Sequence, residues 1–300
     1  MNPMKKSKFN GWQRVLLIIV PYIIIGGLFQ VIGSKIAGID IKDMNGPKDS
    51  YQFCIIAIFS LIGTFLTVLL FKAKVDRESF WSIGFSFKNR GKDLILGLAL
   101  GLLIMGFGFI ILVYLNEIKF VAINFNLSKL LLSILLFVSV ALGEELLIRG
   151  YVLSNLMKSF NKYTALIISS LIFSAAHLAN PDFSWFAFLN IIFAGLLLGL
   201  SYIYTKNIWF PVALHFSWNF FQGSIFGFSV SGQTTYSLIE QSRLSDNLWN
   251  GGQFGFEGSM LAIAFQIIGI FIIWKYFHKE SRADNLSAST NTLTVVPVES

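Results

Sequence analysis

Residues 133–153 read SILLFVSVALGEELLIRGYVL, an apolar run interrupted by two adjacent carboxylates, Glu144 and Glu145. A charge at the middle of a bilayer costs at least about 2.5–3.5 kcal/mol on the membrane-insertion scale. Acidic residues therefore persist inside an apolar helix when they face the interior of a helix bundle and have a task there. This stretch predicts a membrane-embedded helix that carries a buried polar site.

The rest of the chain repeats the apolar pattern. Hydrophobic residues make up 55% of the 300 residues and charged residues only 13%, about half the charged share of a soluble domain. This composition excludes a water-soluble protein and a disordered one. Most of the apolar stretches reach the roughly 17–25 residues that a spanning helix needs. They predict an all-α polytopic membrane protein with about eight transmembrane helices, at 15–32, 53–71, 94–115, 128–148, 164–179, 186–204, 208–222 and 259–277.

The same pattern divides the chain into six segments. Two of them flank the membrane part: a basic cytoplasmic leader and a disordered, Ser/Thr/Asn-rich cytoplasmic tail. A long external loop, expected to act mainly as a tether, separates the last helix from the others. Small-xxx-small spacings at Gly97/Gly101 and Gly195/Gly199 predict close helix packing. The segments are 1–14 (leader), 15–127 (N-terminal helices), 128–222 (core helices), 223–258 (loop), 259–277 (last helix) and 278–300 (tail).

Positive charges predict the orientation, because Lys and Arg gather in cytoplasmic loops. With eight helices and a cytoplasmic N-terminus, 17 of the 23 Lys and Arg residues fall in inside segments. Both termini are therefore expected in the cytoplasm. Because the basic residues are dispersed over loops, a nucleic-acid partner is not expected. The single Cys54 can form neither an intrachain disulfide nor a thiolate metal site.

The two carboxylates differ in their expected partners. Glu145 and Arg149 are four residues apart and share a helix face, so they can form an ion pair. That pair is the structural alternative to a functional site. Glu144 points about 100° away and is left without an intrahelical partner.

Two histidines lie in the short apolar stretches. His177 follows Phe173 by four residues, and Asn219 follows His215 by four residues, so each pair shares a helix face. A carboxylate and an imidazole can activate water for attack on a carbonyl. A His and an Asn can donate hydrogen bonds to the oxyanion that forms. Alternatively, Glu144, His177 and His215 could bind one zinc ion, although the HExxH spacing is missing.

Three motifs in this order resemble the signatures of the CAAX protease and bacteriocin-processing family, whose members are related to type II CAAX prenyl endopeptidase. The resemblance covers residues 128–222. The motifs are Glu144-Glu145-xxx-Arg149-Gly150, Phe173-xxx-His177-xx-Asn180 and His215-xxx-Asn219.

The resemblance implies a role for each motif. Glu144 would be the water-activating base with His177 assisting, and His215 with Asn219 would stabilise the oxyanion. Glu145 and Arg149 would orient the site, with Phe173 and Asn180 as further supporting residues. No cofactor is expected; zinc stays open as an alternative, and we favour a metal-free, Glu/His-activated water.

The expected function is that of an intramembrane endopeptidase in a bacterial cell membrane. Its substrate would be a peptide or membrane-protein segment, such as a leader peptide or a bacteriocin. A non-catalytic immunity or regulatory membrane protein is the first alternative. A transporter with a buried Glu/His relay is the second, although no internal repeat is visible.

Overall fold

Each of the eight apolar stretches forms a helix in the computed structural model, which describes residues 7–40, 46 and 48–293. The expectation of an all-α polytopic membrane protein is confirmed. The helices are α1 (Gly11–Ile36), α2 (Ser50–Phe71), α3 (Gly91–Tyr114), α4 (Leu127–Glu145), α6 (Lys162–Ala175), α7 (Trp185–Thr205), α8 (Trp209–Asn219) and α9 (Met260–Leu293). Shorter helical pieces are η2 (Lys72–Asp76), η3 (Phe80–Ile83), η4 (Leu146–Leu153), α5 (Ser154–Leu156), η5 (Phe220–Ile225), η6 (Gly252–Phe254) and η7 (Phe256–Gly258).

Within the described residues, six helical segments are long and apolar enough to cross a membrane. The two shortest main helices are α6 and α8, which contain or precede the site histidines, as the short apolar stretches predict. Side-chain caps fix several helix starts: Asn126 accepts a hydrogen bond from the backbone N–H of Lys129, and Ser184 from that of Ala187. Such caps satisfy backbone donors that would otherwise stay unpaired at a helix end.

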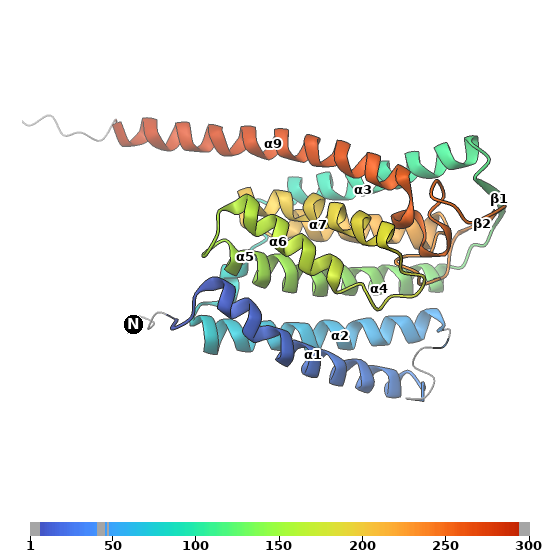
Figure 1. The fold of residues 1–300 in the computed structure, drawn as a ribbon, viewed down its shortest axis with the longest axis horizontal. Helices are drawn as coiled ribbons and strands as arrows, with labels where there is room; N and C mark the ends of the chain where they lie inside the picture. Colours follow the sequence, from blue (N-terminus) through green and yellow to red (C-terminus); the bar gives the residue numbers. More distant parts are fainter. Residues whose placement is uncertain (1–6, 41–45, 47, 294–300) are drawn as a thin grey trace, which may run out of the picture.

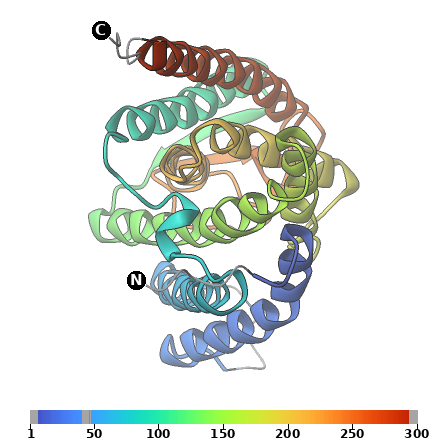
Figure 2. The ribbon, with the colours of Figure 1, turned by 90° about the vertical axis from the view of Figure 1, so that its left-hand side faces the viewer.

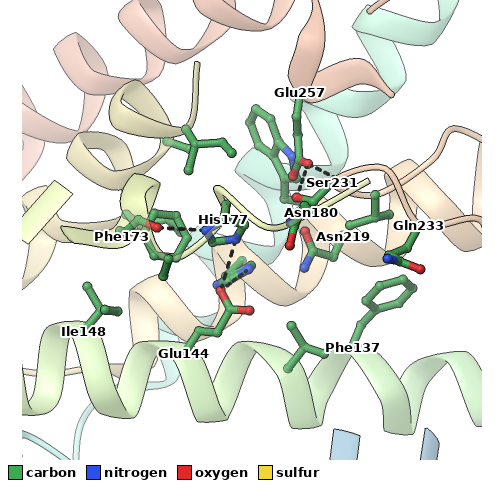
Figure 3. Close-up of a pocket in the computed structure, with 18 of the residues that line it drawn as sticks. Phe137, Glu144, Ile148, Phe173, His177, Asn180, Asn219, Ser231, Gln233 and Glu257 are labelled. Carbon is green, nitrogen blue, oxygen red and sulfur yellow. Dashed lines mark hydrogen bonds and ion pairs between the residues drawn. The ribbon is translucent and has the colours of Figure 1, made fainter. Parts of the chain in front are cut away.

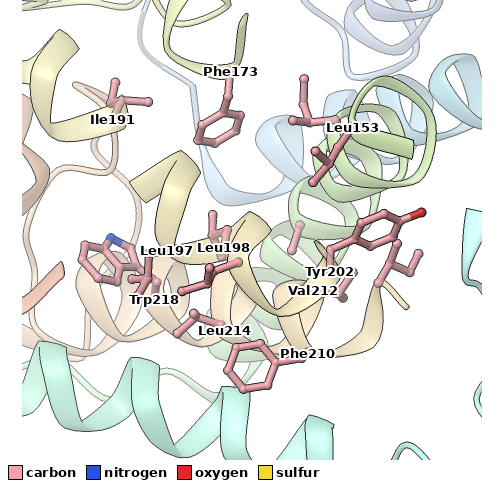
Figure 4. Close-up of a cluster of buried hydrophobic side chains, with 14 of the residues drawn as sticks. Leu153, Phe173, Ile191, Leu197, Leu198, Tyr202, Phe210, Val212, Leu214 and Trp218 are labelled. Atoms are coloured by element: carbon pink, nitrogen blue, oxygen red, sulfur yellow. The ribbon is translucent and has the colours of Figure 1, made fainter. Parts of the chain in front are cut away.

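The helices form a layered bundle. Figure 2 shows α1 and α2 together on one side and α3 with α9 on the other, with α4, α7 and α8 between them. Buried apolar side chains from α6, α7, α8 and η4 fill the centre, among them Phe173, Leu197, Leu214 and Leu153 (Figure 4). Large apolar side chains such as Val20 and Ile23 are exposed along α1, where a spanning helix would face lipid.

The small-xxx-small spacings lie at close helix contacts, as predicted. A Cβ on Gly97 would lie 2.7 Å from the Phe210 carbonyl oxygen of α8, and one on Gly195 would lie 2.8 Å from the Ser170 Cβ of α6. No side chain larger than hydrogen fits at either position without movement.

The helix that carries the two carboxylates continues beyond them. It passes from α4 through the π-helical segment η4 into α5, so that one span runs from Leu127 to Leu156. The span therefore extends beyond the apolar stretch 128–148 that the sequence predicts. π-Helical turns occur often at functional sites, and η4 begins directly after Glu145.

Two strands were not expected. Strand β1 (Ile118–Ile123) pairs antiparallel with β2 (Ile239–Arg243), with Ile118 opposite Arg243 and Ile123 opposite Ile239. The small sheet lies at the end of the bundle away from the first described residues (Figure 1). It ties the segment 223–258 to the chain just before α4, so this segment is a folded part of the protein and not only a tether.

The C-terminal segment also differs from expectation. Helix α9 runs to Leu293, through most of the segment 278–300 that the sequence predicts to be disordered. The stretch KESRADNLSA (279–288) contains neither Gly nor Pro, so no strong helix breaker stops the helix there. Residues 1–6 of the expected leader and 294–300 of the expected tail lie outside the described residues.

Ionic side chains fill the junction where α1, η2 and α5 meet. Asp76 is buried and accepts hydrogen bonds from Lys72, Tyr151 and Asn155. Glu78 pairs with Arg14, Lys72 and Lys158. Burial alone would raise the pKa of Glu78, but hydrogen bonds from Lys158 and Lys72 lower it to about 2.

Candidate active site

Glu144 and two histidines meet in one cavity of about 480 Å³ (Figure 3). Glu144 Oε2 lies 3.9 Å from His177 Nε2 and 3.9 Å from His215 Nε2. Glu144 comes from α4, His177 from the turn directly after α6, and His215 from the middle of α8. Three separate elements thus bring together the groups that the sequence singles out.

Hydrogen bonds fix the orientation of both imidazole rings. His177 Nδ1 lies 2.8 Å from the Phe173 carbonyl oxygen, and His215 Nδ1 lies 2.8 Å from Glu145 Oε1. Since a carbonyl oxygen can only accept, His177 carries a proton on Nδ1. The carboxylate of Glu145 favours the same tautomer of His215. In each ring, Nε2 is the nitrogen that lies 3.9 Å from Glu144 Oε2.

Glu144 itself makes no direct hydrogen bond through Oε2. That atom is buried and has no hydrogen-bond partner among the described residues. A separation of 3.9 Å is too long for a direct hydrogen bond, but one water at normal distance from both atoms can bridge it. The unpartnered oxygen therefore suits a water held between the carboxylate and an imidazole.

Arg149 supports this arrangement from the next turn of the same helix. Its Nη1 donates to Glu145 Oε1 at 2.8 Å, and its Nη2 donates to the Gly195 carbonyl oxygen at 3.1 Å. Its guanidinium carbon lies 4.6 Å from the centre of the Phe173 ring. The ion pair with Glu145 that the spacing predicts is present, and it is buried.

Phe173 connects the two histidines by ring contacts. Its ring meets that of His177 edge-on at 4.8 Å and that of His215 at 6.2 Å between centroids. The side chains of Asn180 and Asn219 line the same cavity. Every residue of the three motifs with a predicted role is therefore in the cavity wall or in direct contact with a residue that is.

Several cavity residues lie outside the motifs. Glu257 and Ser231 come from segment 223–258, Gln266 from α9, and Asn190 and Tyr22 from α7 and α1. A polar residue inside an apolar stretch was an available signal for Asn190 and Gln266. No pattern in the sequence indicated that segment 223–258 would reach the cavity.

The donor set has the chemistry of a zinc site, because both imidazoles present Nε2 and have Nδ1 occupied by an acceptor. However, no group of three or more His, Cys, Asp or Glu side chains in the described part of the chain is arranged to hold a metal ion. The residues present therefore do not form a metal site as they stand.

Comparison with known families gives one match. The family model described as Type II CAAX prenyl endopeptidase Rce1-like matches residues 126–221. Neither the curated proteins nor the solved structures give a match. The matched segment begins at the N-cap of α4 and ends two residues after Asn219, so it contains all three motifs. Over residues 126–221, about a third of the chain, the protein is therefore similar to the Rce1-like type II CAAX prenyl endopeptidases.

Proposed function

We propose that this protein is a membrane-embedded endopeptidase in which Glu144 activates a water molecule for hydrolysis of a peptide bond. The observation that carries the proposal is the placement of the Glu144 carboxylate 3.9 Å from the Nε2 atoms of both His177 and His215 in one cavity. At this distance one water molecule can form hydrogen bonds to the carboxylate and to an imidazole, and these are groups that can act in general base catalysis.

The reaction follows from the positions of these groups. A water between Glu144 and His177 gives a proton to Glu144 while its oxygen attacks the carbonyl carbon of the scissile bond. The carbonyl oxygen becomes an oxyanion. When the tetrahedral intermediate collapses, the C–N bond breaks and the proton held by Glu144 passes to the leaving amine. Glu144 is thereby returned to its carboxylate form.

His215 and Asn219 are assigned to the oxyanion. The Asn219 amide lines the cavity and can donate from Nδ2. A protonated His215 can donate from Nε2 while its Nδ1 proton stays bonded to Glu145. Hydrogen-bond donors aimed at a developing oxyanion in a site that excludes water are commonly the largest single contribution to such catalysis.

The proposed substrate is a peptide or a membrane-protein segment that reaches the cavity within the bilayer; a leader peptide or a bacteriocin fits this class. We also propose a bacterial cell membrane as the location and the cytoplasm as the side of both termini. A non-catalytic immunity or regulatory role remains the alternative. A deletion of residues 223–258 could not distinguish an endopeptidase from an immunity or regulatory protein, because residues of this segment line the cavity.

The test is peptide cleavage by the purified full-length protein, with Glu144→Gln as the variant and Glu240→Gln as the control. Glu240 lies on β2 and is exposed, so its change alters charge outside the cavity. We expect Glu144→Gln to lose about 10²–10⁴-fold in rate while remaining folded, since Gln cannot accept the proton of water. Metal analysis of the same samples tests the zinc alternative. Full activity of Glu144→Gln would exclude Glu144 as the base, and no cleavage by the wild type would contradict the proposal.

A further inference from the structure

A second carboxylate faces the cavity from the segment 223–258. Glu257 lies in η7, and its Oε2 accepts hydrogen bonds from the backbone N–H and the hydroxyl of Ser231 at 2.8 and 2.7 Å. Both residues line the cavity that holds Glu144 (Figure 3). Within the described residues, the hydrogen bonds of Glu257 both go to Oε2, and no Lys, Arg or His forms an ion pair with it.

The cavity as a whole is acidic. Glu144 and Glu257 are the two charged residues in its wall, and no Lys or Arg of the described chain lines it. A carboxylate in a partly enclosed, mostly apolar cavity is stabilised by a positive charge that enters with a ligand. Glu144 has two imidazoles within 4 Å, whereas Glu257 has no such neighbour.

Unpartnered amide groups point to a ligand independently of the charge. Gln266 is fully buried, lines the cavity, and has no hydrogen-bond partner for either side-chain atom. Asn190 Oδ1 is likewise buried and unpartnered, while its Nδ2 donates to the Ser259 carbonyl oxygen at 2.9 Å. Buried polar atoms in native proteins normally have partners, so these groups are suited to a polar ligand.

We propose that the part of the cavity formed by Glu257, Ser231, Asn190 and Gln266 is a subsite for a positively charged residue of the substrate peptide. An ammonium group or a guanidinium has several donors and no acceptor. The cavity lining offers buried, unpartnered acceptor oxygens on Asn190 and Gln266, and the Glu257 carboxylate adds a negative charge. The inference rests on the proposed peptidase function and deepens it, because it names the class of substrate as cationic peptides.

Glu257 also has a structural task that the test must separate from binding. Ser231, whose N–H it accepts, has a φ of 47°, in the left-handed region. Glu257→Gln keeps one oxygen that can accept both Ser231 hydrogen bonds, removes the negative charge and replaces the other acceptor oxygen with an NH2 donor. Glu257→Gln therefore distinguishes a charge-binding role from a loop-stabilising one.

The experiment measures binding instead of turnover, so that it does not depend on hydrolysis. The full-length Glu144→Gln protein in detergent would be titrated with fluorescent apolar peptides in which one Lys, Gln or Glu is moved along the sequence. In the Glu144→Gln variant, Glu257 is the acidic residue that remains in the described cavity wall. We expect at least one position at which the Lys peptide binds about tenfold or more tightly than the Gln peptide, the effect of one charge-assisted hydrogen bond.

Two further variants complete the test. In Glu144→Gln/Glu257→Gln the preference for Lys should fall to within about twofold, whereas in Glu144→Gln/Glu240→Gln it should persist. Equal binding of Lys and Gln peptides at every position, or no binding of any peptide, would overturn the inference. So would a preference that survives Glu257→Gln. If the wild type cleaves neutral and basic peptides alike, the inference fails while the proposed function stands.

Discussion

Glu145 holds His215 in place: its Oε1 accepts a hydrogen bond from His215 Nδ1 at 2.8 Å, and the same atom accepts one from Arg149. The two adjacent carboxylates thus have separate surroundings. Glu145 is fully buried and bonded to a guanidinium and an imidazole, while Glu144 opens into the cavity. The ion pair that competes with a functional interpretation therefore accounts for Glu145 and not for Glu144.

The first prediction concerns this buried pair. Arg149→Met strands the charge of Glu145, so we expect a loss of about 3–5 kcal/mol in unfolding free energy. Glu145→Gln should also destabilise, because it leaves Arg149 without its counter-ion. The double variant Glu145→Gln/Arg149→Met should be more stable than the sum of the two losses predicts, by about 0.5–3 kcal/mol. Denaturation in detergent measures all three, and strictly additive losses would show that the two groups are not coupled. An Arg149→Met protein that is stable but inactive would instead assign Arg149 to the chemistry.

The second prediction concerns Gln266, whose amide is buried and unpartnered. Gln266→Met keeps the volume and removes a desolvation cost of about 1–3 kcal/mol, so the variant should be more stable than the wild type. It should also bind peptides more weakly, because the acceptor oxygen is lost.

Gln222 is the matched control for this change. It is also buried and its Oε1 has no hydrogen-bond partner among the described residues, but its Nε2 donates to the Ser229 carbonyl oxygen at 2.6 Å. Gln222→Met should therefore lower the thermal unfolding midpoint. A Gln266→Met protein that is destabilised as much as Gln222→Met would show that Gln266 has a structural role instead.

The third prediction concerns pH and Glu78. Its pKa is lowered from an ordinary value of 4.5 to about 2 by Lys158 and Lys72, so the folded state favours the carboxylate. Its contribution to stability is fully present above about pH 4.5 and is lost as the pH falls toward 2. Between pH 6 and pH 3 the thermal midpoint of the wild type should fall more than that of Glu78→Gln. Parallel curves for the two proteins would show that Glu78 contributes nothing to acid sensitivity.

The fourth prediction concerns topology. Lys88, between η3 and α3, and Ser242, on β2, are both exposed. Strand β2 lies at one end of the bundle, and α3 begins toward the other end (Figure 1). On a Cys54→Ala background, a membrane-impermeant thiol reagent should label Ser242→Cys in intact cells and Lys88→Cys only after permeabilisation. The opposite pattern would reverse the proposed orientation.

Much of the fold could be predicted from the sequence because lipid imposes a simple pattern. A spanning segment must be apolar and helical along its length, so all eight helices follow from composition alone. The bringing together of Glu144, His177 and His215 was expected from their motifs and from the cost of burying each polar group. The ion pair of Glu145 with Arg149 followed from helical spacing.

The features that could not be predicted are those whose structure depends on contacts between residues far apart in the sequence. The stretch IKFVAI (118–123) has strand-forming residues, but its partner lies more than a hundred residues away and has the polar sequence IEQSR (239–243). The burial of Asp76 likewise depends on Tyr151 and Asn155, which approach it from another helix. The two imidazoles within 4 Å of Glu144 come from the turn after α6 and from α8, so spacing within the helix of Glu144 does not reveal them.

The pairing of β1 with β2 has a consequence for how this protein and its relatives diverge. The residues that we assign to bond cleavage all lie in residues 126–221, which match the family model, whereas Ser231, Glu257 and Gln266 follow that stretch in the chain. The sheet holds this later stretch against the chain just before α4. The later stretch therefore lines the cavity without contributing the residues that we assign to hydrolysis. Substitutions in this wall would change which peptide is accepted and leave the hydrolytic groups untouched, which allows one reaction to be redirected to new substrates in small steps.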